Sequence, residues 1–172
     1  MYKFFTLLLP AFIAMSFVSA DLKPVDAAEA VTFTIKNFGI NTGGEIKGLK
    51  GTIKWDAANP AASVFNVSVD VNTINTGIEM RDTHLKKEEY FNVEKYPVIS
   101  FVSTAVSAGN ITGNLTIKGV TRQVSFPFTV KPSDGGYLFE GEFSANRKDF
   151  GIGGGSVSLG NTVTVNLKVQ AK

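Results

Sequence analysis

The sequence contains no cysteine at all. This absence excludes disulfide bonds, thiolate metal sites, a cysteine nucleophile and the lipidated cysteine of a bacterial lipoprotein. Histidine is almost as scarce, because His84 is the only one, and a single imidazole provides neither a histidine metal cluster nor a second proton shuttle. We therefore expect no metal, no cofactor and no lipid attachment at the N-terminus.

An excess of one charge is also lacking. The 17 Lys and Arg residues nearly balance the 15 Asp and Glu residues, and no long run of like charge occurs. Nothing here resembles the basic stripe of a nucleic-acid binder. Residues 21–172 also lack low-complexity tracts, which predicts one domain without an internal linker.

The only long apolar run lies at the N-terminus, where Lys3 precedes the 15 residues from Phe4 to Val18. A membrane-spanning helix needs about 20 apolar residues. Val18-Ser19-Ala20 instead offers the small residues that a signal peptidase reads. We predict a signal peptide over residues 1–20 and a mature domain over residues 21–172, which is periplasmic or secreted and has no stable membrane anchor.

Apolar and polar residues alternate along most of the mature chain, as in Val31, Phe33 and Ile35. Alternation with a period of two buries one face of a β-strand and leaves the other in water. Short turns such as Asp134-Gly135-Gly136 favour antiparallel neighbours. The eight predicted strands lie near residues 31–35, 53–55, 65–71, 99–101, 111–117, 124–130, 137–143 and 163–169. They can close into a barrel or split into two sheets, and periodicity does not separate a filled core from one with a cavity.

One stretch breaks this rhythm. Thr76 to Tyr90 is rich in helix-forming residues, and Pro97 follows soon after. We predict a short helix there, in the connection between the third and fourth strands.

Two clusters of ionisable residues have competing interpretations. Arg81, Asp82 and His84 either form a polar gate that meets a ligand or cap the predicted helix, and the sequence favours the cap. Arg147 either forms a salt bridge with Asp149 or binds an anionic head group such as phosphate together with Lys148, and composition does not rank these two.

Motifs for catalysis are scarce. No Gly-x-Ser-x-Gly elbow is present, and the glycines of Gly151 to Gly155 lack the Lys-Ser/Thr of a phosphate-binding loop, which favours a flexible turn. A hydrolase that uses His84 with Asp82 would lack a recognisable nucleophile. We therefore predict that the protein is not an enzyme.

Four segments in order, residues 80–85, 90–101, 111–122 and 147–152, resemble the YceI-like family of bacterial periplasmic proteins. These proteins are also called polyisoprenoid-binding, lipocalin-like proteins. The resemblance implies an eight-stranded antiparallel lipocalin-like barrel, with a tunnel for a polyprenyl chain, an isoprenoid quinone or a related lipid, and without catalytic residues.

The first hypothesis is therefore that the protein binds, transports or stores a long-chain lipid or isoprenoid. The inward phase of the strands and the resemblance together suggest an apolar tunnel lined by Phe33, Trp55, Phe65, Phe101, Phe126, Phe128 and Phe143. The predicted polar mouth consists of Arg81, Asp82, His84 and Arg147. The alternative is a filled β-sandwich that presents loops to a protein partner. The family resemblance also suggests that the protein forms a homodimer.

Overall fold

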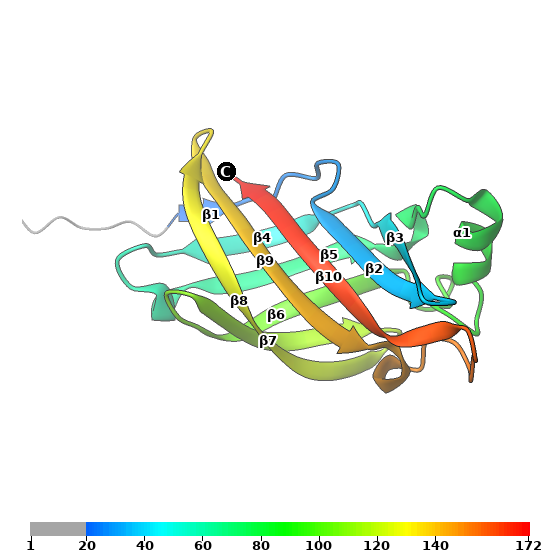
Figure 1. The fold of residues 1–172 in the computed structure, drawn as a ribbon. Helices are drawn as coiled ribbons and strands as arrows, with labels where there is room; N and C mark the ends of the chain where they lie inside the picture. The colour runs from blue at the N-terminus through cyan, green and yellow to red at the C-terminus, as the bar shows by residue number, and fades with distance from the viewer. Residues whose placement is uncertain (1–19) are drawn as a thin grey trace, which may run out of the picture.

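The computed structural model describes residues 20–172, whose fold is drawn in Figure 1. The predicted signal peptide lies outside these described residues, apart from Ala20 at its end. Within residues 20–172, no helix is long and apolar enough to cross a membrane. The described segment is thus the part of the chain that was predicted to form the mature domain.

Residues 20–172 form ten β-strands, one α-helix and three short 3-10 helices. The strands are β1 (Ala20–Leu22), β2 (Val31–Asn37), β3 (Ile40–Glu45), β4 (Lys50–Trp55), β5 (Val64–Asp70), β6 (Val98–Val106), β7 (Asn110–Ile117), β8 (Val120–Ser133), β9 (Gly136–Asn146) and β10 (Leu159–Ala171). The helices are η1 (Pro60–Ala62), η2 (Val71–Thr73), α1 (Glu79–Leu85) and η3 (Arg147–Phe150).

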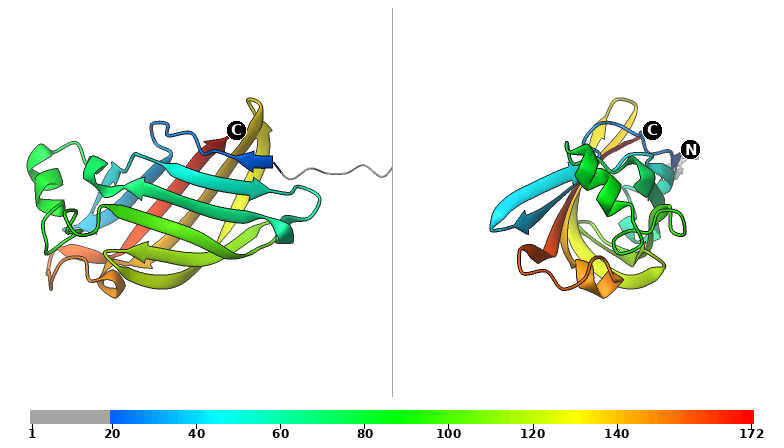
Figure 2. Two further views of the ribbon diagram at one scale, coloured as in Figure 1. Left: turned by 180° about the vertical axis from the view of Figure 1, so that it is seen from behind. Right: turned by 90° about the vertical axis from the view of Figure 1, so that its right-hand side faces the viewer.

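All ten strands join one antiparallel sheet in the order β1-β4-β5-β6-β7-β8-β9-β10-β2-β3. From β4 to β10 each strand pairs with the next one in the chain, whereas β10 pairs back with β2. Strand β8 is long enough to pair with β7 along its first part and with β9 along its second part. The sheet curls into a half-barrel, as the three views in Figures 1 and 2 show.

Hydrogen bonds from neighbouring segments cover both edges of the sheet. Beyond β1, the backbone N–H of Lys23 donates to the carbonyl of Lys172 at 2.9 Å, which links the N-terminal segment to the end of β10. At the other edge, Glu45 of β3 and Asn75 exchange backbone hydrogen bonds of 2.9 and 3.0 Å. Exposed strand edges invite pairing with other chains, and these bonds occupy part of each edge.

The prediction of an all-β antiparallel fold is confirmed, but the predicted count of eight strands is too low. The eight alternating stretches are β2 and β4 to β10, and the two additional strands are β1 and β3. Strand β1 has three residues, too few to show alternation, and β3 reads Ile-Asn-Thr-Gly-Gly-Glu with only one large apolar side chain. As a result α1 follows the fifth strand instead of the third, between β5 and β6.

The inward faces of the strands form one buried apolar cluster. Ile53, Phe65, Phe126, Phe139 and Val169 are each no more than 8 % exposed, although they come from five different strands. At about 25 cal/mol per Å² of buried apolar surface, this shared interior is the main source of stability. The alternating pattern therefore gives the correct inward face for each of these strands.

Two interior rings occupy space that a glycine on the neighbouring strand leaves open. A Cβ atom at Gly44 would lie 2.8 Å from the ring of Phe33. A Cβ atom at Gly113 would overlap the ring of Phe101 and lie 2.6 Å from the carbonyl oxygen of Val102. Side chains cannot approach so closely without displacement, so the positions of these rings require glycine on β3 and β7.

The substitution Gly113→Ala should therefore lower the free energy of unfolding by about 1–3 kcal/mol, because the added methyl group overpacks the interior. Gly109→Ala is the matched control, since no atom lies within 4 Å of the Cβ position at Gly109. Urea unfolding can be followed by the fluorescence of Trp55, the only tryptophan. Equal unfolding midpoints for the two variants would contradict the close packing of Phe101 on Gly113.

Candidate functional site

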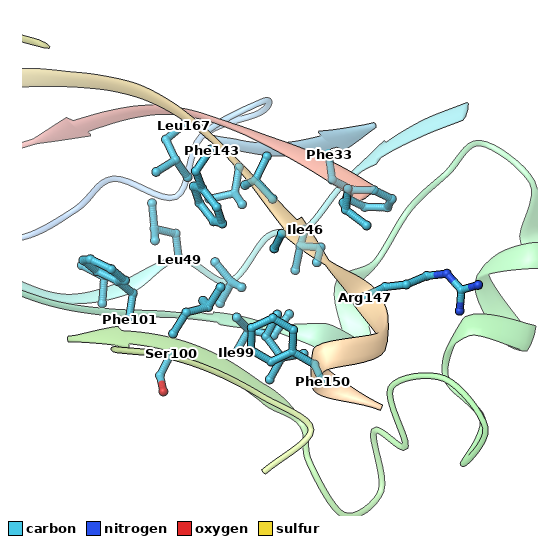
Figure 3. Close-up of a pocket in the computed structure, with 18 of the residues that line it drawn as sticks. Phe33, Ile46, Leu49, Ile99, Ser100, Phe101, Phe143, Arg147, Phe150 and Leu167 are labelled. Atoms are coloured by element: carbon cyan, nitrogen blue, oxygen red, sulfur yellow. The ribbon is translucent and has the colours of Figure 1, made fainter. Parts of the chain in front are cut away.

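The half-barrel encloses a cavity of about 290 Å³. Apolar side chains from both walls and from the connections line it, including Ile46, Leu49, Phe143 and Leu167, which converge on the same space in Figure 3. A cavity with such a lining favours hydrocarbon, because a charged solute would lose its hydration without gaining partners.

Most of the predicted tunnel residues line this cavity. The aromatic residues from the predicted set that line it are Phe33, Phe65, Phe101, Phe126, Phe128 and Phe143. They come from five strands on opposite walls, and the rings of Phe126 and Phe143 stack with centroids 4.9 Å apart. The inward phase of the sequence pattern is therefore correct at these positions.

The prediction that Trp55 lines the cavity is wrong. Trp55 is the last residue of β4, and its ring packs edge-on against Phe65, Phe128 and Phe139 at centroid distances of 6.5, 6.0 and 5.7 Å. Strand β4 ends on the side of the half-barrel remote from α1 (Figure 2), and Trp55, its last residue, contacts these rings and Tyr137 there. The indole N–H of Trp55 is buried without a hydrogen-bond partner among residues 20–172. The aromatic cluster acts as a plug that closes one end of the cavity.

The other end of the cavity lies beneath α1 and the connection that follows it. The right-hand view in Figure 2 shows this segment lying across that end of the half-barrel. Residues with polar side chains border the cavity here, namely Asn37, Thr42, Thr76, Arg81 and Arg147, although nearly all of the surface that faces the cavity is apolar. A cavity with an apolar surface and polar side chains at its border matches a molecule with a long apolar chain and a more polar head.

Arg147, the first residue of η3, is 3 % exposed and carries a charge without an acidic partner. Its guanidinium instead donates to backbone carbonyls, with Nε 2.8 Å from Gly160 O and Nη1 2.7 Å from Ile152 O. Longer bonds reach Gly153 O, Gly154 O, Leu159 O and Asn161 Oδ1. Arg147 forms no salt bridge with Asp149, so that interpretation is wrong, and its donors bond to the protein. Binding of an anionic group stays a prediction.

The same contacts explain the glycine-rich segment before β10. The carbonyls of Gly153 and Gly154 face the guanidinium, and a Cβ atom at Gly153 would lie 2.9 Å from Nη1 of Arg147. Gly153 also has a φ of 66°, which side chains rarely adopt. The predicted flexible turn is thus a loop that wraps a buried arginine.

Arg81 and Asp82 anchor α1 to the segment before it. The carboxylate of Asp82 accepts the backbone N–H of Thr76 at 2.9 Å, while Arg81 Nη2 donates to the carbonyl of Thr76 at 2.7 Å. These bonds hold α1 to the connection before it, but no side chain caps the helix itself, because its N-cap residue is Ile78. Arg81 also lines the cavity, whereas Asp82 does not.

His84 lies away from the cavity. Its side chain is exposed, and its ring packs on Tyr90 with centroids 4.8 Å apart. Of the four predicted mouth residues, the structure therefore brings only Arg81 and Arg147 to the cavity wall. Because α1 is helical, the side chains of Asp82 and His84 point away from the cavity. The order of residues in the sequence motif does not show these directions.

Two carboxylates near this end have lowered pKa values. The backbone N–H of Glu29, and next the Lys47 ammonium, hold the pKa of Glu45 below its usual range. The backbone N–H of Asn72 does the same for the pKa of Asp70. Lowered values favour the ionised form, so this stabilisation is present at neutral pH and is lost as the pH falls through the folded-state pKa. A general acid at neutral pH needs the opposite shift.

Sequence reasoning missed the cavity residues that lie outside the alternating strands. Ile46 and Leu49 precede β4, while Tyr90 and Phe91 follow α1. Their only signal is an apolar residue within a connection, which also fits a loop that packs on the core. Within residues 20–172, no group of three or more His, Cys, Asp or Glu side chains is placed to hold a metal ion.

Comparison with known proteins identifies the family of this chain. Residues 23–171 match the YceI-like domain. The chain belongs to the YceI-like family. This confirms the resemblance drawn from the four sequence segments.

Relatives of this YceI-like chain include a UPF0312 protein of Pseudomonas aeruginosa and Protein YceI of Salmonella arizonae. Each is 36% identical over 133 residues, which cover 71% of this chain and 70% of the relative. BcnA of Burkholderia cenocepacia has a similar structure, with a TM-score of 0.76 and 28% identity over 81% of this chain and 93% of BcnA. A polyisoprenoid binding domain from Saccharophagus degradans gives 0.69 and 16% identity, covering 88% of this chain and 97% of that one.

In this YceI-like protein, Arg147→Met should lower the free energy of unfolding by about 2–4 kcal/mol, because buried carbonyls lose their donors. Arg122→Met is the matched control, since Arg122 is exposed and donates only to Thr121 O, at 3.1 Å. Chemical denaturation of both variants measures the difference. If Arg147→Met keeps the wild-type stability, the guanidinium does not support the loop.

Proposed function

We propose that this protein binds a long apolar ligand in the periplasm and carries or stores it without chemical change. The ligand class is a polyisoprenoid, an isoprenoid quinone or a related lipid. The observation that carries the proposal is the cavity of about 290 Å³, which is apolar within, plugged at the Trp55 end and bordered by polar side chains beneath α1.

The energetics of an apolar chain are sufficient for such a role. A buried methylene contributes about 0.8 kcal/mol, so roughly fifteen buried carbons, or about three isoprene units, contribute about 12 kcal/mol. An association cost of about 4 kcal/mol then leaves about 8 kcal/mol, which corresponds to a micromolar Kd. No ion pair with the ligand is required.

The size of the cavity also limits the length of ligand that it can hold. Small-molecule pockets typically span about 300–1,000 Å³, and the cavity of about 290 Å³ is close to the lower bound. A chain much longer than a few isoprene units would therefore fill the cavity and continue outside it through the polar end. This favours a ligand whose apolar tail enters first and whose head stays near Arg81 and Thr76.

The relatives support the ligand class and the compartment. The domain from Saccharophagus degradans is described as polyisoprenoid binding, and its fold matches with a TM-score of 0.69. Family membership and the apolar segment over residues 4–18 together support export to the periplasm. The filled β-sandwich, the alternative considered from the sequence, does not account for the cavity.

A binding protein also fits the polar groups better than a hydrolase does. The carboxylate of Asp82 accepts hydrogen bonds from Thr76, and His84 packs on Tyr90, so the two are not arranged as a catalytic pair. Arg81 and Thr76, which line the cavity beneath α1, are instead bonded to each other and form no pair with His84.

Native mass spectrometry of the mature protein, purified from its own host, tests the proposal. The expected result is a bound species whose mass matches a lipid recovered by organic extraction. A clean apo mass with no extractable lipid, together with no uptake of farnesol added in solution, would contradict it.

A blocked cavity provides the matched comparison. Ile99→Trp should reduce bound farnesol at least about tenfold, because Ile99 lines the cavity and the larger ring fills it. Val102→Trp is the control, since Val102 lies on the same strand with its side chain 42% exposed. Unchanged farnesol binding by folded Ile99→Trp protein would place the ligand outside this cavity.

A further inference from the structure

The polar end of the cavity is surrounded by highly exposed apolar side chains, which we call the apolar rim. The rim consists of Phe38, Ile40, Ile78, Met80 and Val157. Each is more than half exposed, with Phe38 at 81% and Met80 at 83%, whereas other exposed large apolar residues of the described chain do not exceed 44%.

Three separate segments bring the rim together. Phe38 lies in the β2–β3 turn and Ile40 begins β3. Ile78 and Met80 lie at the start of α1, and Val157 lies between η3 and β10. The backbone N–H of Phe38 donates to Ser158 O at 2.9 Å, which joins the first segment to the third. Figure 2 shows all three segments at the end of the half-barrel that α1 covers.

The backbone at Phe38 provides independent support. Phe38 and Gly39 form the tight turn with φ values of 49° and 78°. The first position of such a turn prefers Asn, Asp or Gly, and a bulky side chain there is strained. A phenylalanine that is both strained and exposed adds nothing to the stability of the isolated fold, so its use lies in a contact outside the chain.

The distribution of charge indicates what that contact is. Residues 37–44, 71–78 and 150–167, which contain most of the rim and its supports, hold no charged side chain. Lys36 and Lys148 are exposed behind these tips, although Glu79 and Asp149 lie at this end as well. Uncharged tips avoid the cost of placing a charge in hydrocarbon, while lysines behind them suit lipid phosphates.

We propose that the apolar rim docks the protein on the surface of a lipid bilayer, with the polar end of the cavity facing the membrane. This inference rests on the proposed function, because an apolar chain can then pass between bilayer and cavity without crossing water. Docking is reversible, since five side chains bury far less apolar surface than a spanning helix.

Vesicle flotation of the mature protein tests docking, with vesicles of phosphatidylethanolamine and phosphatidylglycerol. The rim variant combines Phe38→Asn, which suits the turn, with Met80→Gln. Its matched control combines Val64→Gln with Val102→Gln, which change exposed apolar residues outside the rim. We expect the rim variant to bind vesicles at least about tenfold more weakly than wild type, and the control to bind as wild type.

Farnesol binding in solution, without vesicles, separates this inference from the proposed function. Equal farnesol binding by wild type and the rim variant, together with the loss of flotation, supports docking. Wild-type protein that binds farnesol but does not float, or a rim variant that floats normally, overturns docking and leaves the proposed function intact.

The same samples identify other occupants of the rim. A dimer that forms without vesicles and is dissociated by the rim substitutions would overturn membrane docking in favour of contact between two copies. A host protein that crosslinks to the rim of wild-type protein, in the absence of flotation, would overturn it in favour of a protein partner.

Discussion

A single curled sheet has to bury the apolar faces of its strands against one another, because α1 is only seven residues long and no second sheet covers the interior of residues 20–172. Side chains from opposite walls must therefore meet across the centre. Near Trp55 they do, since the rings of Phe65, Phe128 and Phe139 pack edge to face there. Toward α1 they do not meet, and the space left between them is the cavity. Plug and cavity are two outcomes of the same constraint.

The end beneath α1 depends on a different balance, between a buried charge and the backbone. The guanidinium of Arg147 has no acidic partner, yet its donors are satisfied by carbonyls from residues 152–160. Glycines make this possible because carbonyls can approach without intervening side chains. The loop then keeps its shape without charged residues of its own, which leaves Val157 free to belong to an uncharged rim. The bonds of Arg147 thus stabilise the loop and allow the rim to remain uncharged.

Much of the fold follows from the sequence, because alternation reports directly which side of a strand is buried. It assigned the correct inward phase to Phe33 and Phe101, and it located the strands that carry them. It missed β1 and β3, since one is very short and the other is polar and glycine-rich. Strands β1 and β3 form because they pair with neighbouring strands, and their own sequences do not predict a strand.

The site was less predictable, because alternation gives the face of a residue but not its position along the barrel. Trp55 faces inward as expected, but strand register puts it in the plug instead of the cavity. The partners of Arg147 are backbone carbonyls from a loop, which no side-chain motif indicates. Ligand chemistry could be inferred only from the family resemblance, since an apolar interior by itself fits a filled core equally well.

A crystal structure of the protein purified from its own host, without added detergent, is the most direct measurement of the central claim. We expect continuous, elongated density in the cavity, starting near Arg81 and Thr76 and ending at the rings of Phe65 and Phe128. Interior side chains that close the cavity, or density for ordered water alone, would contradict it.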